Sequence, residues 1–152
     1  KFKIFSQVGL GLQLLSPPRS LKFFVNSVSN FTGLGFSVSS LVVNPLAWLN
    51  ELERTIGRVV VTELECSDIN VANKGTAKVF LKSTQDIRDE LDDFVLNREH
   101  RLNKVKCKLE SNEYSGVFEL RGNGTVRISK LPENIFFPLL RETLEIVFAL
   151  EN

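Results

Sequence analysis

Apolar and polar residues alternate along residues 103–111, NKVKCKLES, with the period of two that is typical of a strand with one buried face. The residues predicted to face inward are Val105, Cys107 and Leu109. The residues predicted to face outward are Lys104, Lys106 and Lys108. Residues 58–66 and 75–83 are rich in β-branched and other apolar residues, so we predict two further strands, joined by a turn at residues 73–75.

A helical period appears in other segments, and the best-defined helix is NPLAWLNELERTIG, residues 44–57. Asn44 is able to cap its start, Pro45 suits its first turn, and Gly57 suits the position after its end. The sequence therefore predicts both ends of this helix.

A second helix is predicted from a cap at Ser83 or Thr84 to about Asn97. Its apolar stripe consists of Ile87, Leu91, Phe94 and Val95. Its other face carries Asp86, Asp89, Glu90, Asp92 and Asp93. These carboxylates repel one another unless basic neighbours screen them, and the basic segment 98–108 follows directly.

Both ends of the chain also contain helical patterns. Residues 21–31 predict a short amphipathic helix, whose apolar stripe suits core packing or, alternatively, contact with a membrane or a partner. Near the other end, Pro138 suits the start of a helix that runs to about residue 145. The alternation of apolar residues from Leu144 to Leu150 leaves an extended end as the alternative.

The segment RGNGT, Arg121–Thr125, contains two glycines that suit either a phosphate-binding loop or the tip of a hairpin. A phosphate-binding glycine loop leads from a strand into the N-terminus of a helix, whereas this segment leads into another predicted strand. A three-residue loop at 122–124 places Leu120 opposite Val126 and keeps the apolar side chains of both strands on one face. We therefore predict a hairpin.

Together these elements predict an α+β fold with a largely antiparallel sheet, helices packed on one face and a helical N-terminal arm. Composition changes near residue 40, because residues 1–40 are rich in Phe, Leu, Gly and Ser and poor in acids. We expect residues 1–40 to form an arm or packing element and residues 41–152 to form the α+β domain, as one structural unit overall.

The 19 Lys and Arg residues nearly balance the 18 Asp and Glu residues, so the net charge is +1. This balance argues against strong attraction of the whole chain to nucleic acid or to an acidic substrate, and any attraction must be local. No apolar run reaches the ~18 residues of a transmembrane helix. Because residue 1 is Lys rather than Met, removal of an upstream signal or anchor is one alternative, with a membrane-peripheral or cell-envelope location.

Residues able to carry catalysis are scarce. The one histidine, His100, lies in a charged stretch and is expected to be a solvated loop residue rather than a general base. Cys66 and Cys107 lack metal-ligand spacing and are expected to be buried free thiols, with one disulfide as the alternative. The acidic run lacks the glycine turn of a calcium loop. We therefore expect no catalytic residue, no metal site and no cofactor.

The candidate binding residues are Lys104, Lys106, Lys108, Arg101, Phe23, Phe24 and Phe31. Three lysines on one face of a strand are able to hold phosphate groups of a lipid or of nucleic acid. The alternatives are protection of an exposed sheet edge and pairing with the acidic helix. Tyr114 is the only aromatic residue polar enough to suggest a stacking platform nearby, which disfavours nucleic acid.

The order of elements also resembles that of a known family. A proline-started helix, NPLAWLNELERTIG, adjoins a strand, and AKVFLKSTQDIRDEL then joins a strand to a helix that carries Asp86-Ile87 and Leu91. Further strands and LPENIFFPLL follow. Over about residues 40–145 this order looks like the bacterial LmeA-like family of envelope lipid-binding proteins. The resemblance implies phospholipid binding by an elongated α/β fold without catalytic residues.

Two functions follow as hypotheses. The first is a non-catalytic binding module for lipid or an anionic membrane surface. The second is a structural or assembly protein, in which the Phe-rich N-terminal arm docks a protein partner or a second copy. Phe side chains of the arm that face solvent would favour docking, whereas an enclosed apolar tunnel would favour lipid.

Overall fold

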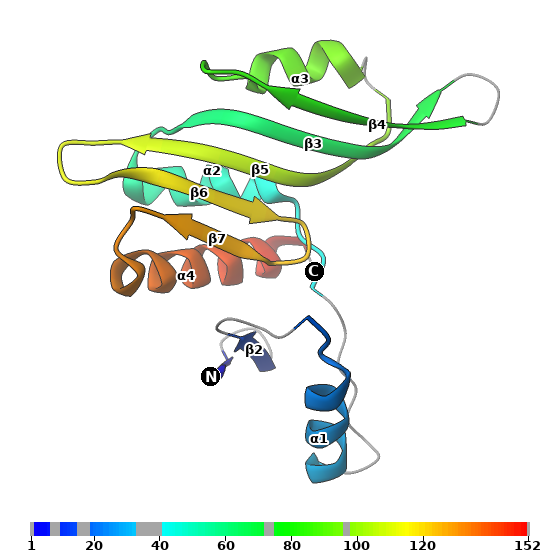
Figure 1. The fold of residues 1–152 in the computed structure, drawn as a ribbon, viewed down its shortest axis with the longest axis vertical. Helices are drawn as coiled ribbons and strands as arrows, with labels where there is room; N and C mark the ends of the chain where they lie inside the picture. The colour runs from blue at the N-terminus through cyan, green and yellow to red at the C-terminus, as the bar shows by residue number, and fades with distance from the viewer. Residues whose placement is uncertain are drawn as a thin grey trace. The chain divides into compact units, whose positions relative to one another are not determined.

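The computed structural model describes residues 2–6, 10–14, 19–32, 41–71, 75–95 and 98–151. The chain divides into two compact units, Lys1–Ser40 and Leu41–Asn152 (Figure 1).

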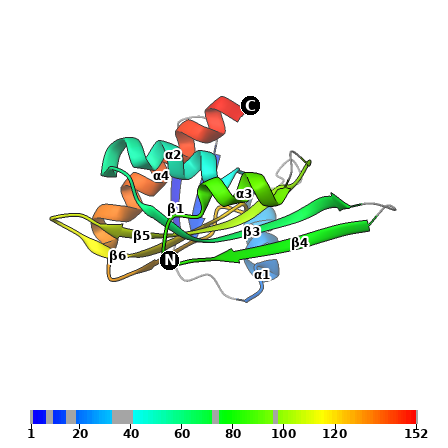
Figure 2. The same ribbon diagram turned by 90° about the horizontal axis from the view of Figure 1, so that it is seen from above.

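The larger unit is a five-stranded sheet with helices on one face. Its elements are α2 (Pro45–Ile56), β3 (Val60–Val71), β4 (Gly75–Lys82), α3 (Arg88–Val95), β5 (Arg101–Glu110), β6 (Ser115–Arg121), β7 (Val126–Ser129) and α4 (Glu133–Glu151). The strands lie in the order β4-β3-β5-β6-β7, and each neighbouring pair is antiparallel. Figure 2 shows α2, α3 and α4 on the same side of the sheet. The predicted α+β fold with a largely antiparallel sheet is confirmed.

The smaller unit contains a hairpin of β1 (Phe2–Ser6) and β2 (Leu10–Leu14), followed in the chain by helix α1 (Lys22–Thr32). The helix predicted over residues 21–31 is confirmed. The hairpin was not predicted, so the arm is helical only in part. Each strand has five residues, and a run that short does not separate a strand from a helix by its pattern alone.

The core of the larger unit lies between the sheet and its helices. The inward residues predicted for β5, Val105, Cys107 and Leu109, are all buried. From the helix side, the Trp48 indole N–H donates to the Leu140 carbonyl and to the Thr143 hydroxyl, each at 3.0 Å. These bonds join α2 to α4 and satisfy the one polar group of a large buried side chain.

Helix α2 starts and ends where the sequence predicts. Asn44 Oδ1 accepts a hydrogen bond from the Leu46 N–H at 2.9 Å, and Pro45 occupies the first position of the helix. Gly57, which follows the helix, has a φ of 81° that glycine adopts at little cost. Residues at the two ends of α2 therefore determine where the helix begins and ends.

Helix α3 begins at Arg88, so the cap predicted at residues 83–84 is wrong. The Asp86 carboxylate instead accepts a hydrogen bond from the Arg88 N–H at 3.2 Å. A bond from the Ile87 N–H to the Val61 carbonyl at 3.1 Å holds the preceding segment against β3. Pairing with the sheet therefore delays the start of the helix.

The apolar stripe predicted for α3 is confirmed at Ile87, Leu91 and Val95, which are buried, but Phe94 is exposed. The exposed acids of the helix are Asp89, Glu90 and Asp93. The predicted end at Asn97 lies outside the described residues.

Helix α4 starts five residues before Pro138 and continues to Glu151. The predictions that Pro138 starts the helix and that its end becomes extended are therefore wrong. An internal proline removes one backbone hydrogen bond. The buried stripe of Phe136, Leu140 and Val147 holds the helix in place in spite of that loss.

The hairpin predicted around the two glycines is confirmed. Leu120 lies opposite Val126, and the Arg121 N–H donates to the Thr125 carbonyl at 3.0 Å. Gly124 has a φ of 75°, the conformation that a bulged three-residue tip requires. The glycine segment leads into β7 rather than into a helix, so it lacks the helix N-terminus of a phosphate-binding loop.

Strand β3 extends beyond its predicted end at Cys66 and reaches Val71. Its pairing with β4 shifts between Cys66 and Ile69, where Asp68 has a φ of 58°. This bulge lets the strand continue with a change of register. The predicted turn residues 73 and 74 lie outside the described residues.

Candidate functional site

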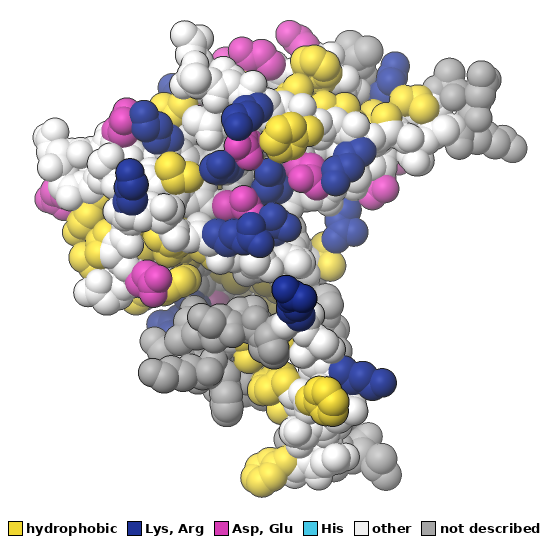
Figure 3. Space-filling view, viewed as in Figure 1, with side chains coloured by type: hydrophobic (Ala, Val, Ile, Leu, Met, Phe, Trp, Pro, Cys, Tyr) yellow, Lys and Arg dark blue, Asp and Glu magenta, His cyan; other side chains and the backbone are white. Residues whose placement is uncertain are grey.

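The face of the sheet opposite the helices is charged, and we call it the open face. Its charged residues are Lys78, Lys82, Lys104, Lys106, Lys108, Arg121, Arg127, Glu63, Glu65, Glu110 and Glu119. Figure 3 shows Lys and Arg side chains gathered over the strands, with Asp and Glu side chains between them.

Residues paired in register form a row across all five strands. In order from β4 to β7, the row is Lys82, Glu63, Lys106, Glu119 and Arg127. The sign of the charge alternates at every step, so each cross-strand pair is attractive. Charge therefore supports strand pairing along this row, whereas beside it Lys104 lies opposite Arg121, a pair of like charge.

The open face has an excess of positive charge. The residues named above are seven Lys or Arg residues and four Glu residues, so together they have a formal charge of +3. The whole chain has a net charge of only +1. The positive charge is therefore concentrated on one face, where it creates a local attraction for anions.

Glu63 is the centre of the strongest charge cluster on this face. Lys106 Nζ lies 3.0 Å from one carboxylate oxygen and Lys104 Nζ lies 3.1 Å from the other. Lys82 Nζ lies 3.6 Å from the carboxylate as well. Burial alone would raise the pKa of Glu63, but hydrogen bonds and charge from the lysines outweigh it and lower the pKa. Three ammonium groups thus share one carboxylate.

The lysines of β5 differ in how accessible they are. The Lys104 side chain is 11% exposed and lies over the Phe80 ring, with Nζ 4.7 Å from the ring centroid. Lys106 is partly buried, whereas Lys108 is exposed and pairs with Glu110 at 2.7 Å. Lys108 is therefore the most available of the three to a ligand in solution.

Both alternatives for the lysines are wrong. Edge protection is excluded because β5 lies between β3 and β6, inside the sheet. Pairing with the acidic helix is contradicted as well, because the carboxylate partner of Lys104 and Lys106 is Glu63 of β3 and that of Lys108 is Glu110 of β5.

Sequence reasoning missed the glutamates that complete the open face. Glu63 and Glu65 alternate with Leu64 and Cys66, so the period of two already marks them as outward residues of β3. The pairing of β3 with β5 was not predictable from the sequence pattern, because Lys104 and Glu63 lie 41 positions apart in the chain.

A second ion network was also missed. The Arg88 guanidinium donates to Asp86 at 2.7 Å, to Glu53 at 2.8 Å and to the Val59 carbonyl at 3.0 Å. Burial would raise the pKa of Asp86, but the hydrogen bonds and charge of Arg88 lower it instead. This network joins α2, the residue before β3 and the start of α3.

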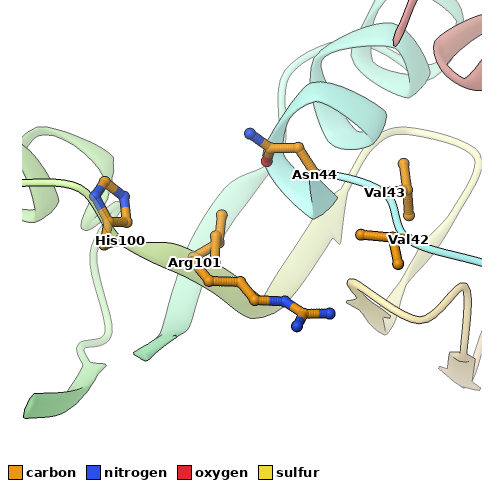
Figure 4. Close-up of a pocket in the computed structure, with 6 residues that line it drawn as sticks. Val42, Val43, Asn44, His100 and Arg101 are labelled. Atoms are coloured by element: carbon orange, nitrogen blue, oxygen red, sulfur yellow. The ribbon is translucent and has the colours of Figure 1, made fainter. Parts of the chain in front are cut away.

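Arg101 lies at the start of β5, in a shallow hollow of about 280 Å³ that residues 42–44 and 100–102 line. Figure 4 shows the Arg101 side chain extending toward Val42, with the His100 ring farther from Val42, before the start of the strand. His100 is exposed, as expected, and its Nδ1 lies 2.9 Å from the Arg98 carbonyl oxygen.

The candidate phenylalanines lie on α1 in the smaller unit. Phe23 is 82% exposed and Phe31 is 93% exposed, whereas Phe24 is half-buried. The segment 19–32 contains Arg19 and Lys22 but no acid. Exposed aromatic side chains beside positive charge suit the boundary region of a membrane.

A further hollow of about 380 Å³ lies between the end of α2, the β5–β6 connection and the start of α4. Its apolar lining includes Ile56, Leu109 and Phe136. Like the hollow beside Arg101, it is open to solvent rather than enclosed.

Cys66 and Cys107 are buried free thiols, as predicted. Burial raises the pKa of Cys66 to about 11 and raises the pKa of Cys107 as well. Neither thiol is therefore a nucleophile near neutral pH. Within the described residues, no three His, Cys, Asp or Glu side chains are grouped to hold a metal ion. No described helix has the length and apolarity needed to cross a membrane.

No protein-family model, curated protein or solved structure matches the chain. The resemblance to the LmeA-like family stays a prediction.

Proposed function

We propose that this protein is a non-catalytic module that binds an anionic membrane surface at its periphery. The observation that carries the proposal is the open face, whose formal charge of +3 contrasts with +1 for the whole chain. A lipid surface of negative charge fits a flat face on which exposed lysines and arginines are spread over several strands.

The phenylalanines of α1 supply a second kind of contact. Each Lys or Arg near an anionic surface contributes about 1 kcal/mol, and a single weak signal gives only marginal, reversible binding. Phe23 and Phe31 are exposed and add apolar contact area. The open face and α1 therefore act as two signals on one chain.

The small volume and the openness of the hollows favour binding at a membrane surface over enclosure of a lipid chain. Drug-sized ligands are held in clefts of about 300–1,000 Å³ that cover most of the ligand surface. The hollows described above measure about 280 and 380 Å³, below and at the lower end of that range, and both are open to solvent. They suit a side chain or a short group rather than a whole lipid.

The experiment is cosedimentation of the full chain with vesicles. Vesicles that contain phosphatidylglycerol should bind the protein more tightly than vesicles of phosphatidylcholine alone. Binding should weaken as salt is added, because charges are screened over about 8 Å at physiological ionic strength. Equal binding to both kinds of vesicle, or binding that salt does not change, would contradict the proposal.

A second candidate function is docking of a protein partner through α1. The exposure of Phe23 and Phe31 favours it, because large apolar side chains that face solvent commonly mark a contact surface. The vesicle experiment separates the two functions: a chain that sediments with neither kind of vesicle would make docking the better account of these side chains.

A further inference from the structure

The two edges of the sheet differ in length and therefore in how well they resist pairing. β7 forms one edge with four residues, and β4 forms the other with eight. A short edge strand discourages further pairing, whereas a long one presents a row of backbone N–H and C=O groups to another strand. Of the two edges, β4 offers the longer row to a partner, and Lys78 and Lys82 along it restrict the registers in which a second strand is able to pair.

The side chains of β4 are also incompletely covered. Ala77, Val79 and Leu81 face the helices but are only partly buried. On the open face, Phe80 is 53% exposed. An added strand beside β4 would remove apolar surface from water on both faces of the sheet.

The residues of β4 complement a second copy of the same strand in one register. In a two-fold symmetric, antiparallel strand pair, the numbers of any two residues that lie opposite each other add up to the same sum. With Val79 opposite Val79, Lys78 lies opposite Phe80. In the same register Lys82 lies opposite Thr76 and Leu81 opposite Ala77. Every pair then combines compatible side chains, and each ammonium group meets an aromatic ring or a hydroxyl.

The neighbouring registers are unfavourable. A shift that centres the pair on Phe80 places Lys78 opposite Lys82 in both halves. A shift that centres it on Lys78 places the two copies of Lys78 opposite each other. A register centred between two neighbouring residues would place residues opposite each other whose side chains point to different faces of the sheet. Like charges directly opposite destabilise a strand pair, so the register centred on Val79 is favoured over these two neighbours.

We propose that β4 pairs antiparallel with β4 of a second copy of this chain, with Val79 opposite Val79. The two five-stranded sheets then form one continuous sheet, and both open faces lie on the same side of it. Each Phe80 ring lies between Lys104 of its own copy and Lys78 of the second copy. The dimer doubles the basic surface.

The first test uses a disulfide that reports the register. Residues opposite each other in an antiparallel pair have Cα atoms about 4.5–5.5 Å apart, which a disulfide spans. Val79→Cys should therefore form a covalent dimer under mild oxidation. Ala77→Cys is the matched control and should stay uncrosslinked, because its copies would lie about four residues out of register. Within one copy, Cys66 of β3 lies directly opposite position 79. Both variants are therefore made in a Cys66→Ala background, in which no intrachain disulfide to position 79 competes, and Cys107 is buried.

The second test changes the charge opposite Lys82 at an exposed position. Thr76→Glu adds two attractive cross-strand pairs and should lower the dimer dissociation constant about two- to thirtyfold. Thr76→Lys adds two repulsive pairs and should raise it by a similar factor. Sedimentation equilibrium measures both constants. Thr76 is exposed, so both variants should unfold at the same urea concentration as the wild type when compared as monomers.

Three results would overturn the proposal. The first is a wild-type chain that stays monomeric at every concentration, together with a Val79→Cys variant that gives no crosslink. The second is a dimer that crosslinks equally well through positions 77 and 79. The third is a dimer whose dissociation constant moves in the same direction for Thr76→Glu and Thr76→Lys.

Discussion

Single carboxylates decide how much positive charge the open face presents. Glu63 neutralises part of the charge of Lys82, Lys104 and Lys106, and its own pKa is lowered because the lysines outweigh its burial. A lowered pKa means that the pairs stabilise the fold above the ordinary pKa of 4.5. That contribution is lost as the pH falls through the lower pKa of the folded state.

Replacement of Glu63 by Gln should separate stability from binding. The variant leaves the largely buried Lys104 without its carboxylate partner and should lower the free energy of unfolding by roughly 1–3 kcal/mol. It also raises the charge of the open face, so anionic vesicles should bind the folded protein more tightly. Urea unfolding and cosedimentation measure the two effects.

Glu110→Gln is the control for that change. Glu110 and Lys108 are both exposed, and exposed pairs contribute about 0–1 kcal/mol. Its unfolding should therefore stay close to that of the wild type. A Glu63→Gln variant that is as stable as Glu110→Gln would show that the cluster around Glu63 contributes nothing to the fold.

The elements of the fold differ in how far local sequence determines them. Helix α2 and the β6–β7 hairpin were predicted with their ends, because Asn44, Gly57 and Gly124 impose conformations that no distant contact overrides. The predicted start of α3 was wrong because the Ile87 N–H forms a backbone hydrogen bond with β3. A bond to a strand that is distant in the chain is not visible in the local sequence. The helix start predicted at Pro138 was wrong for a similar reason, since the packing of α4 against the core determines where the helix begins and ends.

Gly124→Val tests the hairpin at its tip. A valine there must adopt a φ near 75°, and its Cβ would lie 2.7 Å from Leu41 Cδ2. The expected cost is of order 1–3 kcal/mol in the free energy of unfolding. Asn123→Asp at the same tip has neither penalty and keeps an oxygen that accepts the hydrogen bond from the Thr125 N–H, so it serves as the control. Equal unfolding midpoints in urea for the two variants would contradict the conformation that we describe.

At the scale of the whole molecule, strand order creates the candidate site. The sequence identified Lys104, Lys106 and Lys108 as one polar face, but it did not show that this face lies in the middle of a sheet. Their placement follows from the pairing of β5 with both β3 and β6. Glu63 and Arg127 belong to the same row although 63 residues separate them in the chain. The periodic pattern of apolar and polar residues does not show which distant strands pair with each other.

That placement also changes which substitutions test the membrane proposal. Reversal of Lys104 and Lys106 to Glu would surround the Glu63 carboxylate with like charge and would damage the fold together with the surface. Lys108 and Arg127 are exposed and lie on the same face, so they report on binding with little effect on folding.

The most direct measurement compares two variants of equal net charge on vesicles that contain phosphatidylglycerol. Lys108→Gln with Arg127→Gln removes two charges from the open face, and Arg54→Gln with Arg58→Gln removes two exposed charges at the end of α2. At about 1 kcal/mol for each charge near the surface, the first variant should bind roughly tenfold or more weakly than the wild type. The second should bind nearly as well as the wild type. Equal losses for the two variants would contradict the assignment of membrane binding to the open face.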